Sequence, residues 1–419
     1  MAAERTTVNF PPYKGGLVEI KGGRILGIGR GLVRYYSDDK GRTWSRPEPV
    51  VQDGRQIIGE GDPVSLLRLA SGKIALTYGR PLEKQELPRA AAAAFDHYRG
   101  LERSGLFFRT SSDEGRTWSP EVMVRGPGIV WWYALNDTLL QLRNGRLLWG
   151  CYGGSSAYRP NPSPKVEGLE RGVGHLWAPE GLGISKFFYS DDEGGHWKAS
   201  KDDLMMWLDH GRGNLASLGE VTAAEASDGR IVALARSDVM RAIQTFSTDG
   251  GERWTLAELS ELNTSNAPVR VKRIPATGDL MVVWNQVTAE EHRLGYGRCL
   301  LSAATSKDGG RSWTNFRNIW VSPGLDERPR VVDPEPAKFV RPGSATRPDD
   351  PPPDNAIHGQ IRASYANVYF FGDEVFIEHD QWYRTNLWAT GNVPREWEDL
   401  DPQKGKGRRL HIIPLKWFY

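Results

Sequence analysis

The chain has 419 residues, of which 39% are hydrophobic and 25% are charged, and these proportions are ordinary for a globular protein. Its formal net charge of +2 produces no large field of either sign. That balance argues against nucleic acid as a partner and leaves any attraction for acidic ligands to a local cluster.

The first residues, Met-Ala-Ala-Glu-Arg-Thr-Thr, contain no basic region followed by an apolar stretch, and no apolar run in the chain is long enough to span a bilayer. We therefore expect no membrane partner, and either a cytoplasmic protein or a secreted one whose leader has been removed. Cys151 and Cys299 each lie inside an apolar, strand-like run. The favoured interpretation is two buried free thiols, and a single disulfide is the alternative.

Six segments share one plan, in which two apolar runs flank a turn that contains glycine. Asn-Gly or Asp-Gly between apolar runs is a strong hairpin signal, because these residues tolerate the positive φ angles of a tight turn. We therefore predict a β-hairpin in each segment. In chain order the segments are Leu17–Gly29, Pro63–Gly79, Thr138–Tyr152, Val221–Arg236, Pro268–Asn285 and Ala366–Asp380.

A second motif, Ser-x-Asp-x-Gly-x-x-Trp, follows each of the first five hairpins after another short β-rich run. Its Asp side chain can accept hydrogen bonds from the N–H groups of the turn, Gly supplies a positive φ angle, and Trp covers the turn with an apolar face. Five evenly built copies are a strong signal for a repeated outer hairpin. The copies begin at Ser37, Ser111, Ser190, Ser247 and Ser306.

Six inner hairpins, five of them followed by an outer hairpin, predict an all-β fold: a six-bladed β-propeller with four antiparallel strands per blade. The 16 tryptophans and 47 glycines suit such a fold of short strands and tight turns. The sixth blade lacks the motif, and we expect the last strand, Arg409–Phe418, to form its outer edge. Closing the ring with a terminal strand would remove the exposed edges.

Three insertions interrupt this pattern, and we expect all three on one face of the propeller. Residues 82–103 contain an alanine run that predicts a helix, whereas residues 153–184 and 322–360 are rich in Gly and Pro and are expected to be loops. A disordered surface loop is the alternative for the proline-rich segment. No separate domain is needed, so we predict that residues 1–419 form a single propeller domain.

The second motif resembles the Asp box of sialidases, and six blades with five such boxes resemble the sialidase fold over nearly the whole chain. The resemblance implies an exo-acting glycosidase that removes a terminal sialic acid or related acidic sugar from a glycan, without a metal or other cofactor. Sialidases hold the substrate carboxylate with three arginines, use a Tyr paired with a Glu as nucleophile, and use an Asp as acid and base. Asp boxes also occur in glycosidases of other specificity and in propellers that only bind partners, because a fold does not fix a function.

Four residues match the family's pattern of positions. Glu220 opens the fourth inner hairpin and Arg236 closes it, and these resemble the partner of the nucleophile and the second arginine. Arg298, before the strand that leads into the fifth box, resembles the third arginine. Tyr365, which opens the sixth inner hairpin, resembles the nucleophile. A carboxylate can take the proton of a phenol, and paired arginines can hold a carboxylate by bidentate hydrogen bonds.

Two of the family's residues are missing at their expected places. Lys14 stands where the first arginine is expected, and it supplies a cation without a planar fork. The stretch Gly29-Arg30-Gly31 contains no carboxylate where the acid is expected. Asp62 or Asp137, each at the start of an inner strand, is a candidate replacement, although either residue also suits a strand-start turn.

Other observations leave further functions open. Trp132 precedes the third inner strand, where it would stack on a sugar or pack in the core. The histidines have no metal-ligand spacing, so no metal site is predicted. His175 and His358 lie in the insertions, as would suit a propeller lyase acting on uronic acids. A glycosidase for another uronic or neutral sugar, and a propeller that binds glycan or protein without catalysis, are the remaining alternatives.

Overall fold

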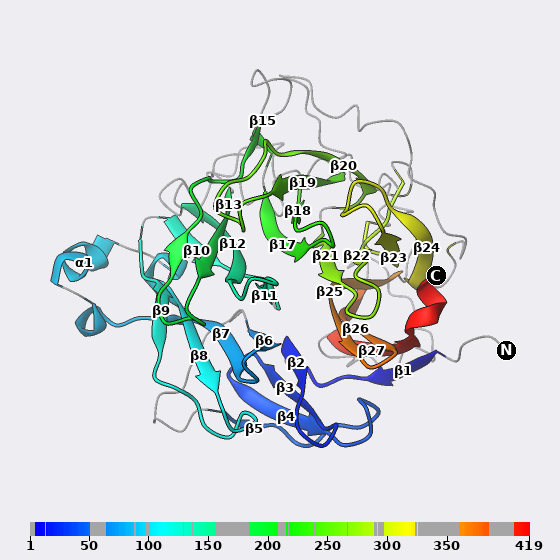
Figure 1. The fold of residues 1–419 in the computed structure, drawn as a ribbon, viewed down its shortest axis with the longest axis horizontal. Helices are drawn as coiled ribbons and strands as arrows, with labels where there is room; N and C mark the ends of the chain where they lie inside the picture. The colour runs from blue at the N-terminus through cyan, green and yellow to red at the C-terminus, as the bar shows by residue number, and fades with distance from the viewer. Residues whose placement is uncertain are drawn as a thin grey trace.

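The structure is a computed structural model, and it is all β apart from short helical turns. Six antiparallel sheets are arranged as blades around a central axis, with the first strand of each blade innermost (Figure 1). This ring confirms the predicted six-bladed β-propeller. The residues described are 5–12, 14–50, 64–87, 89–97, 100–128, 130–135, 137–155, 184–207, 215–216, 218–237, 240–265, 267–288, 291, 297–322, 325, 360–384 and 406–419.

The first three blades follow one another along the chain, each strand pairing with the next. In blade 3 the innermost position is shared, because β10 and β11 pair with different halves of the long strand β12. Blade 1 contains β2 (Gly15–Glu19), β3 (Ile25–Gly29), β4 (Val33–Ser37) and β5 (Glu48–Pro49); blade 2 contains β6 (Ser65–Arg68), β7 (Ile74–Pro81), β8 (Ser104–Ser111) and β9 (Val122–Arg125); blade 3 contains β10 (Val130–Tyr133), β11 (Leu139–Gln141), β12 (Leu147–Ser155), β13 (Ile184–Ser190) and β14 (Lys198–Ala199).

The last three blades repeat this plan. A separate two-stranded sheet, β15 (Met206–Trp207) with β16 (Leu215–Ala216), precedes blade 4. Blade 4 contains β17 (Gly219–Glu225), β18 (Ile231–Arg236), β19 (Arg241–Ser247) and β20 (Glu258–Asn263); blade 5 contains β21 (Arg270–Arg273), β22 (Leu280–Trp284), β23 (Leu300–Ser306) and β24 (Thr314–Val321); blade 6 contains β25 (Gln360–Phe371), β26 (Glu374–Arg384), β27 (Lys406–Pro414) and β1 (Thr6–Asn9).

The ring is closed by the N-terminal strand, which corrects our expectation for blade 6. Strand β1 pairs antiparallel with β27, from Thr6 opposite Ile412 to Asn9 opposite Arg409, and is therefore the outermost strand. The last segment, predicted as the outer edge, supplies the third strand instead and then turns into the 3-10 helix η7 (Leu415–Phe418). Blade 6 thus joins both ends of the chain in one sheet, and β1 satisfies the edge of β27 that would otherwise be open.

The Asp boxes have the turn chemistry expected from their residues. In the first box the Ser37 hydroxyl donates to Asp39 (2.9 Å) and accepts from the Gly41 N–H (2.8 Å), while the Asp39 carboxylate accepts from the Thr43 N–H (2.8 Å). These hydrogen bonds, led by the one from the Thr43 hydroxyl, lower the pKa of Asp39 to about 2. Because the carboxylate is held ionised, the turn keeps its hydrogen bonds across the physiological pH range.

Each box also packs against the preceding blade. A Cβ atom on Gly41 of blade 1 would lie 2.5 Å from Phe376 of blade 6, and one on Gly194 of blade 3 would lie 2.0 Å from Phe108 of blade 2. Both glycines have positive φ angles, of 81° and 92°. The box glycine is therefore required twice, by the turn and by the close approach of the neighbouring blade.

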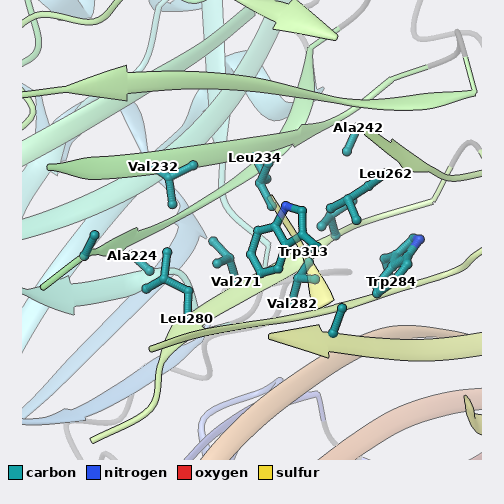
Figure 2. Close-up of a cluster of buried hydrophobic side chains, with 13 residues drawn as sticks. Ala224, Val232, Leu234, Ala242, Leu262, Val271, Leu280, Val282, Trp284 and Trp313 are labelled. Carbon is teal, nitrogen blue, oxygen red and sulfur yellow. The ribbon is translucent and has the colours of Figure 1, made fainter. Parts of the chain in front are cut away.

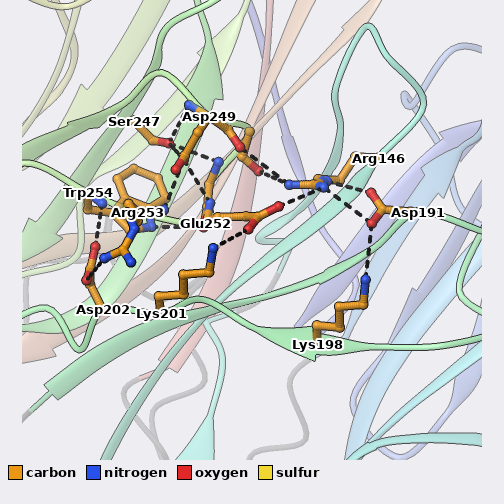
Figure 3. A network of polar contacts seen from close by, with 12 residues as sticks. Arg146, Asp191, Lys198, Lys201, Asp202, Ser247, Asp249, Glu252, Arg253 and Trp254 are labelled. Atoms are coloured by element: carbon orange, nitrogen blue, oxygen red, sulfur yellow. Dashed lines mark hydrogen bonds and ion pairs between the residues drawn. The ribbon is translucent and has the colours of Figure 1, made fainter.

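Polar contacts join the boxes to the neighbouring blades as well (Figure 3). Arg146 of blade 3 donates to Asp191 of its own blade (2.6 Å), to the Gly250 carbonyl (3.2 Å) and to Glu252 (3.2 Å) in the box of blade 4. On the same box, Lys201 pairs with Glu252 at 3.0 Å. One arginine therefore crosses the gap between two blades and fixes the box turn from outside.

The hydrophobic core is divided among the gaps between adjacent blades. Between blades 4 and 5, for example, Val232 and Leu234 face Val271 and Val282, with Trp313 over them (Figure 2). Side chains of this kind are fully buried in an aliphatic environment and account for most of the stabilisation of the ring. Each blade depends on its neighbours for this burial, which is why the ring must close.

The insertions and cysteines test three smaller predictions. The helix expected in residues 82–103 is confirmed only for the alanine run, as α1 (Arg89–Ala94). The described residues on either side include the 3-10 helices η1 (Lys84–Glu86), η2 (Phe95–His97) and η3 (Gly100–Arg103). The insertions near 153–184 and 322–360 lie almost entirely outside the described residues. Cys151 and Cys299 are both buried and neither forms a disulfide, so the alternative of a disulfide is wrong. Among the helices described, none has the length and apolarity needed to cross a bilayer.

Candidate functional site

Blades 3, 4 and 6 each place one polar residue at the same unusual backbone position. Asp137, Glu220 and Tyr365 have positive φ angles of 56°, 49° and 58°. At Glu220 and Tyr365 this position is a β-bulge, because the register of the inner hairpin shifts there. A left-handed backbone costs a non-glycine residue about 1–3 kcal/mol, and such strain is retained where surrounding contacts hold it, commonly at functional sites.

Four of the residues predicted from the sequence meet in one place. The Arg236 guanidinium pairs with the Glu220 carboxylate at 2.8 Å, and the same Nη1 atom donates to the Tyr365 hydroxyl at 3.4 Å. Arg298 makes a hydrogen bond to the Tyr365 phenol and lies over its ring, with 5.4 Å between its Cζ atom and the ring centroid. These residues come from blades 4, 5 and 6, so the ring itself assembles the group.

The arrangement differs in one respect from the expected roles. Glu220 was predicted to take the phenol proton and Arg236 to hold a substrate carboxylate, but Arg236 lies between Glu220 and Tyr365. Burial lowers the pKa of Arg236, while the charge of Glu220 and the Tyr365 phenol raise it more, so its pKa is raised overall. Burial lowers the pKa of Arg298, against the opposing effect of the Tyr365 phenol. Both guanidiniums stay charged at neutral pH.

Lys14 lies where the sequence places a substitute for the first arginine, beside the phenol. Its ammonium is 4.1 Å from the centroid of the Tyr365 ring and forms an ion pair with Asp380. Arg408 donates to the same Asp380 carboxylate at 2.8 Å and also pairs with Glu378. Part of the charge of Lys14 is therefore balanced within the protein before any ligand binds.

Asp380 and Arg408 were missed in the sequence, although one signal was available for Asp380. Counting outward from the turn between β25 and β26 places Asp380 beside the bulge, directly opposite Ser364. The bulge adds only one residue to β25 after Ser364, so Asp380 stays close to Tyr365, the next residue along the strand. Nothing in the local sequence around Arg408 indicates that its side chain reaches Asp380, because β27 joins the sheet after a long intervening segment.

Asp137 does not join the group around Tyr365. Its side chain is 1% exposed and its carboxylate forms an ion pair with Lys272 of blade 5. Burial raises its pKa, and the charges of Lys272 and Arg270 oppose that rise. Such a carboxylate is placed to join blades 3 and 5 rather than to reach a substrate. The other candidate acid, Asp62, lies outside the described residues.

Trp132 is placed differently from the prediction of a sugar-stacking residue. Its side chain is buried in the cluster between blades 2 and 3, edge-on to Phe188 with 5.8 Å between ring centroids. These surroundings favour core packing over sugar stacking. Tyr152, also from blade 3, lies closer to the group around Tyr365. Burial is the main reason that the pKa of Tyr152 is raised, and the nearby charge of Glu220 raises it further.

Aromatic residues border the group on two sides. On one side Tyr133 and Trp131 lie edge-on to Tyr152, with centroid distances of 5.7 Å and 6.1 Å. On the other side Trp382 of blade 6 lies 5.8 Å from the Arg298 guanidinium. Aromatic faces and edges of this kind are suited to the apolar faces of sugar rings. Tyr152 and Trp382 were not singled out in the sequence, because their nearness to Tyr365 depends on how the blades are arranged.

The described residues contain no group of three or more His, Cys, Asp or Glu side chains that could hold a metal ion. The two histidines considered for a lyase, His175 and His358, lie outside the described residues. The groups that the described part brings together are the Tyr365 phenol, the Glu220 carboxylate and two guanidiniums, with the Lys14 ammonium and its partner Asp380 beside them.

Comparisons with known proteins agree with the propeller. The family model for the BNR repeat-like domain matches residues 32–376. A protein of unknown function from Dyadobacter fermentans is similar in structure at 15% identity and a TM-score of 0.58, with 98% of each chain covered. No curated protein matches the chain.

Sialidases are among the similar solved structures. The Hadza microbial sialidase Hz136 is 15% identical with a TM-score of 0.55, and the match covers 88% of this chain and 63% of that one. The NanB sialidase of Streptococcus pneumoniae is 12% identical with a TM-score of 0.54, covering 98% and 69%. The chain thus spans just under two thirds of Hz136 and slightly more than two thirds of NanB. At these identities the likeness to sialidases concerns the fold alone. Because the family model covers most of the chain, the protein belongs to the BNR repeat-like family, and its six-bladed propeller is similar to the fold of these sialidases.

Proposed function

We propose that this protein is a glycoside hydrolase that removes a terminal acidic sugar, sialic acid or a related one, from a glycan. The observation that supports the proposal is that the side chains of Tyr365, Glu220, Arg236 and Arg298 meet. Two guanidiniums beside a phenol provide a clamp for a sugar carboxylate next to a nucleophilic oxygen.

In the first step, the Tyr365 oxygen attacks the anomeric carbon and the bond to the leaving oxygen breaks. The phenol proton passes to Glu220, and an acid donates a proton to the leaving oxygen. Arg236, held between Glu220 and Tyr365, stabilises the negative charge that moves between them. Arg298 and Arg236 hold the sugar carboxylate.

In the second step, water attacks the anomeric carbon and the bond to the Tyr365 oxygen breaks. The conjugate base of the acid takes a proton from the water, and Glu220 returns its proton to the tyrosine oxygen. Two displacements at one carbon retain the anomeric configuration. Both steps leave all charges and protons balanced.

Asp62 is our candidate for the acid. The competing candidate, Asp137, is 1% exposed and forms an ion pair with Lys272, and both features disfavour it as the acid. Asp62 stands two residues before Val64, at the start of the innermost hairpin of blade 2. Its role remains a prediction from that position.

A specific observation favours an acidic sugar other than sialic acid as the second candidate substrate. Lys14 replaces an arginine fork, and Asp380 already pairs with it. The clamp for a substrate carboxylate then consists of Arg236 and Arg298, and Arg236 also pairs with Glu220. In a hexuronic acid the carboxylate is attached away from the anomeric carbon, so the two arginines would have to hold it farther from the carbon that Tyr365 attacks.

The proposal is tested by the hydrolysis of fluorogenic glycosides of sialic acid, uronic acids and neutral sugars. We expect release from an acidic sugar, and a loss of at least about 1,000-fold in kcat in the Tyr365→Phe variant, because the nucleophilic oxygen is removed. Tyr36→Phe, on β4 and away from the site, is the control and should keep wild-type kcat. Release that persists in Tyr365→Phe would contradict the proposal, and silence with every glycoside would favour a lyase or a binding propeller.

A further inference from the structure

Arg270 is a fully buried arginine whose guanidinium reaches residues of three other blades. It is the first residue of β21 in blade 5, and 1% of its surface is exposed. Its guanidinium donates to the carbonyl oxygens of Asp137 (3.2 Å) and Ala366 (3.4 Å) and to the side-chain oxygens of Thr222 (3.4 Å) and Asn367 (2.8 Å). No feature of the proposed reaction calls for this residue directly.

The acceptors of Arg270 are grouped around the three strained backbone positions. Asp137 itself has a positive φ angle, Ala366 follows Tyr365 within the bulge of blade 6, and Thr222 ends the bulge that contains Glu220. A bulge interrupts the ladder of hydrogen bonds, so backbone carbonyls near it need other donors. A guanidinium offers five donors in one plane and can serve several such acceptors at once.

The contacts continue from Arg270 into the rest of the ring. Asn367, which accepts from Arg270, donates to the Gly15 carbonyl of blade 1 at 3.2 Å and to Glu378 of blade 6 at 2.7 Å. Glu378 in turn pairs with Arg408, which binds Asp380 beside Lys14. A single buried side chain is therefore connected to blades 1, 3, 4 and 6 from its place in blade 5.

We propose that Arg270 is a positioning residue: by holding the bulges of blades 4 and 6 with one rigid fork, it fixes where Glu220 and Tyr365 lie relative to each other. The inference rests on the proposed function, because only a reaction between these two groups makes their spacing matter. Arg236 and Arg298 stand at the end of β18 and before β23, outside the two bulges whose residues accept hydrogen bonds from Arg270. The residue therefore acts on the reacting pair more than on the clamp for the substrate carboxylate.

This division predicts different effects on turnover and on binding. A displacement of about 1 Å in a reacting group can lower a rate by about 100-fold, whereas a clamp left in place keeps its affinity. In Arg270→Lys the charge is retained, but an ammonium cannot span acceptors on three blades. We expect kcat to fall by about 100-fold while the dissociation constant of the sugar acid released by the enzyme changes by less than about threefold.

The matched control is Arg109→Lys, which changes another buried arginine. Arg109 donates to the Tyr78 hydroxyl at 2.8 Å within blade 2 and takes no part in the proposed site. Both variants should lower the melting temperature, and kcat and the dissociation constant are measured at 25 °C, well below it. Loss of kcat in Arg270→Lys alone, with affinity retained, supports the proposal. Unchanged kcat, or equal losses of kcat and affinity, overturns it.

Two further measurements cover the remaining outcomes. If Arg270→Lys does not fold, Thr222→Val removes one acceptor at the Glu220 bulge, and a reduced kcat with unchanged affinity supports the proposal while an unchanged kcat overturns it. If the wild type hydrolyses no glycoside, the proposed function fails on its own. The crystal structure of Arg270→Lys then decides: relaxation of the φ angles at Glu220 and Tyr365 supports positioning, and unchanged bulges overturn it.

Discussion

Arg236 is the residue whose surroundings say most about the proposed chemistry. It is buried together with Glu220, and one of its nitrogen atoms is shared by the carboxylate and the phenol. Taking a single charge out of water is expensive, so a buried arginine is retained where partners compensate that cost. Here the partners are the two groups between which a proton would move, and the arginine lowers the cost of negative charge on either.

Arg298 allows the clamp to be tested separately from the phenol. In Arg298→Lys the positive charge remains but the fork is lost, so one charge-assisted hydrogen bond to a substrate carboxylate should disappear. That loss is worth about 1.5–3 kcal/mol, which corresponds to about 10- to 150-fold in kcat/KM. We expect the effect with acidic glycosides mainly as an increased KM. Arg317→Lys, on β24 of the same blade, is the control, and equal effects of both changes would contradict a role in the clamp.

The sequence predicts the residues around Tyr365 better than the contacts among them. Glu220, Arg236 and Tyr365 were found through the resemblance to sialidases, because each stands near the start or end of a predicted hairpin where that family places its site residues. In the structure Tyr365 lies inside β25, at the bulge, rather than at its start. Arg270 was not found, since its significance depends on acceptors from three other blades. Strand position is a local property that a sequence displays, whereas contacts across the axis depend on how all six blades are placed.

At the scale of elements, blade 6 contains a buried histidine pair that joins β26, β27 and β1. His379 Nδ1 donates to the Asp380 carbonyl (3.0 Å), so its neutral Nε2 accepts from His411 Nε2 (2.9 Å). His411 Nδ1 then accepts from the Thr7 hydroxyl on β1 (2.9 Å). Both rings are neutral in this arrangement, and protonation would set two N–H groups against each other.

This pair predicts that acid weakens the folded state. Burial lowers the pKa of His379 from 6.5 to about 4, and burial also lowers that of His411. Because the unfolded histidines bind protons first, stability is complete above about pH 6.5 and falls as the pH decreases toward 4. For His379 alone, the free energy of unfolding should decrease by about 2 kcal/mol between pH 7 and pH 5.

The measurement is urea unfolding at both pH values. His411→Gln should reduce this pH dependence, whereas His196→Gln, an exposed histidine in the third box, should keep it. An identical pH dependence in wild type and His411→Gln would show that the pair is not responsible. The box carboxylates do not interfere, since Asp39 and Asp113 have pKa values of about 2, well below this range.

The elements themselves were predicted unevenly, for a physical reason. In the first Asp box the Ser and Asp side chains make hydrogen bonds to residues at most four positions away, so the turn itself can be predicted from its own sequence. The closing strand β1 has no such signature, because its partner β27 lies at the other end of the chain. Its short alternating sequence gains a partner only when the ring is complete.

At the scale of the whole molecule, the ring gathers charges that are far apart in the sequence. Lys14, Arg236 and Arg298 meet two carboxylates, Glu220 and Asp380, so the described group carries one positive charge in excess. The chain as a whole has a net charge of +2, which provides little steering. Attraction for an acidic sugar is therefore a property of the site, and it arises only when the blades assemble.

The most direct test of the central claim is to trap the glycosyl intermediate on Tyr365. A fluorine beside the anomeric carbon withdraws electrons and slows the second step, so difluorosialic acid or a fluorinated uronosyl fluoride should leave the sugar bound to the protein. Mass spectrometry of the digested protein should show the added sugar on the peptide that contains Tyr365, in the wild type and in Tyr36→Phe but not in Tyr365→Phe. A sugar bound elsewhere, or no adduct with either reagent while a glycoside is still hydrolysed, would contradict the account.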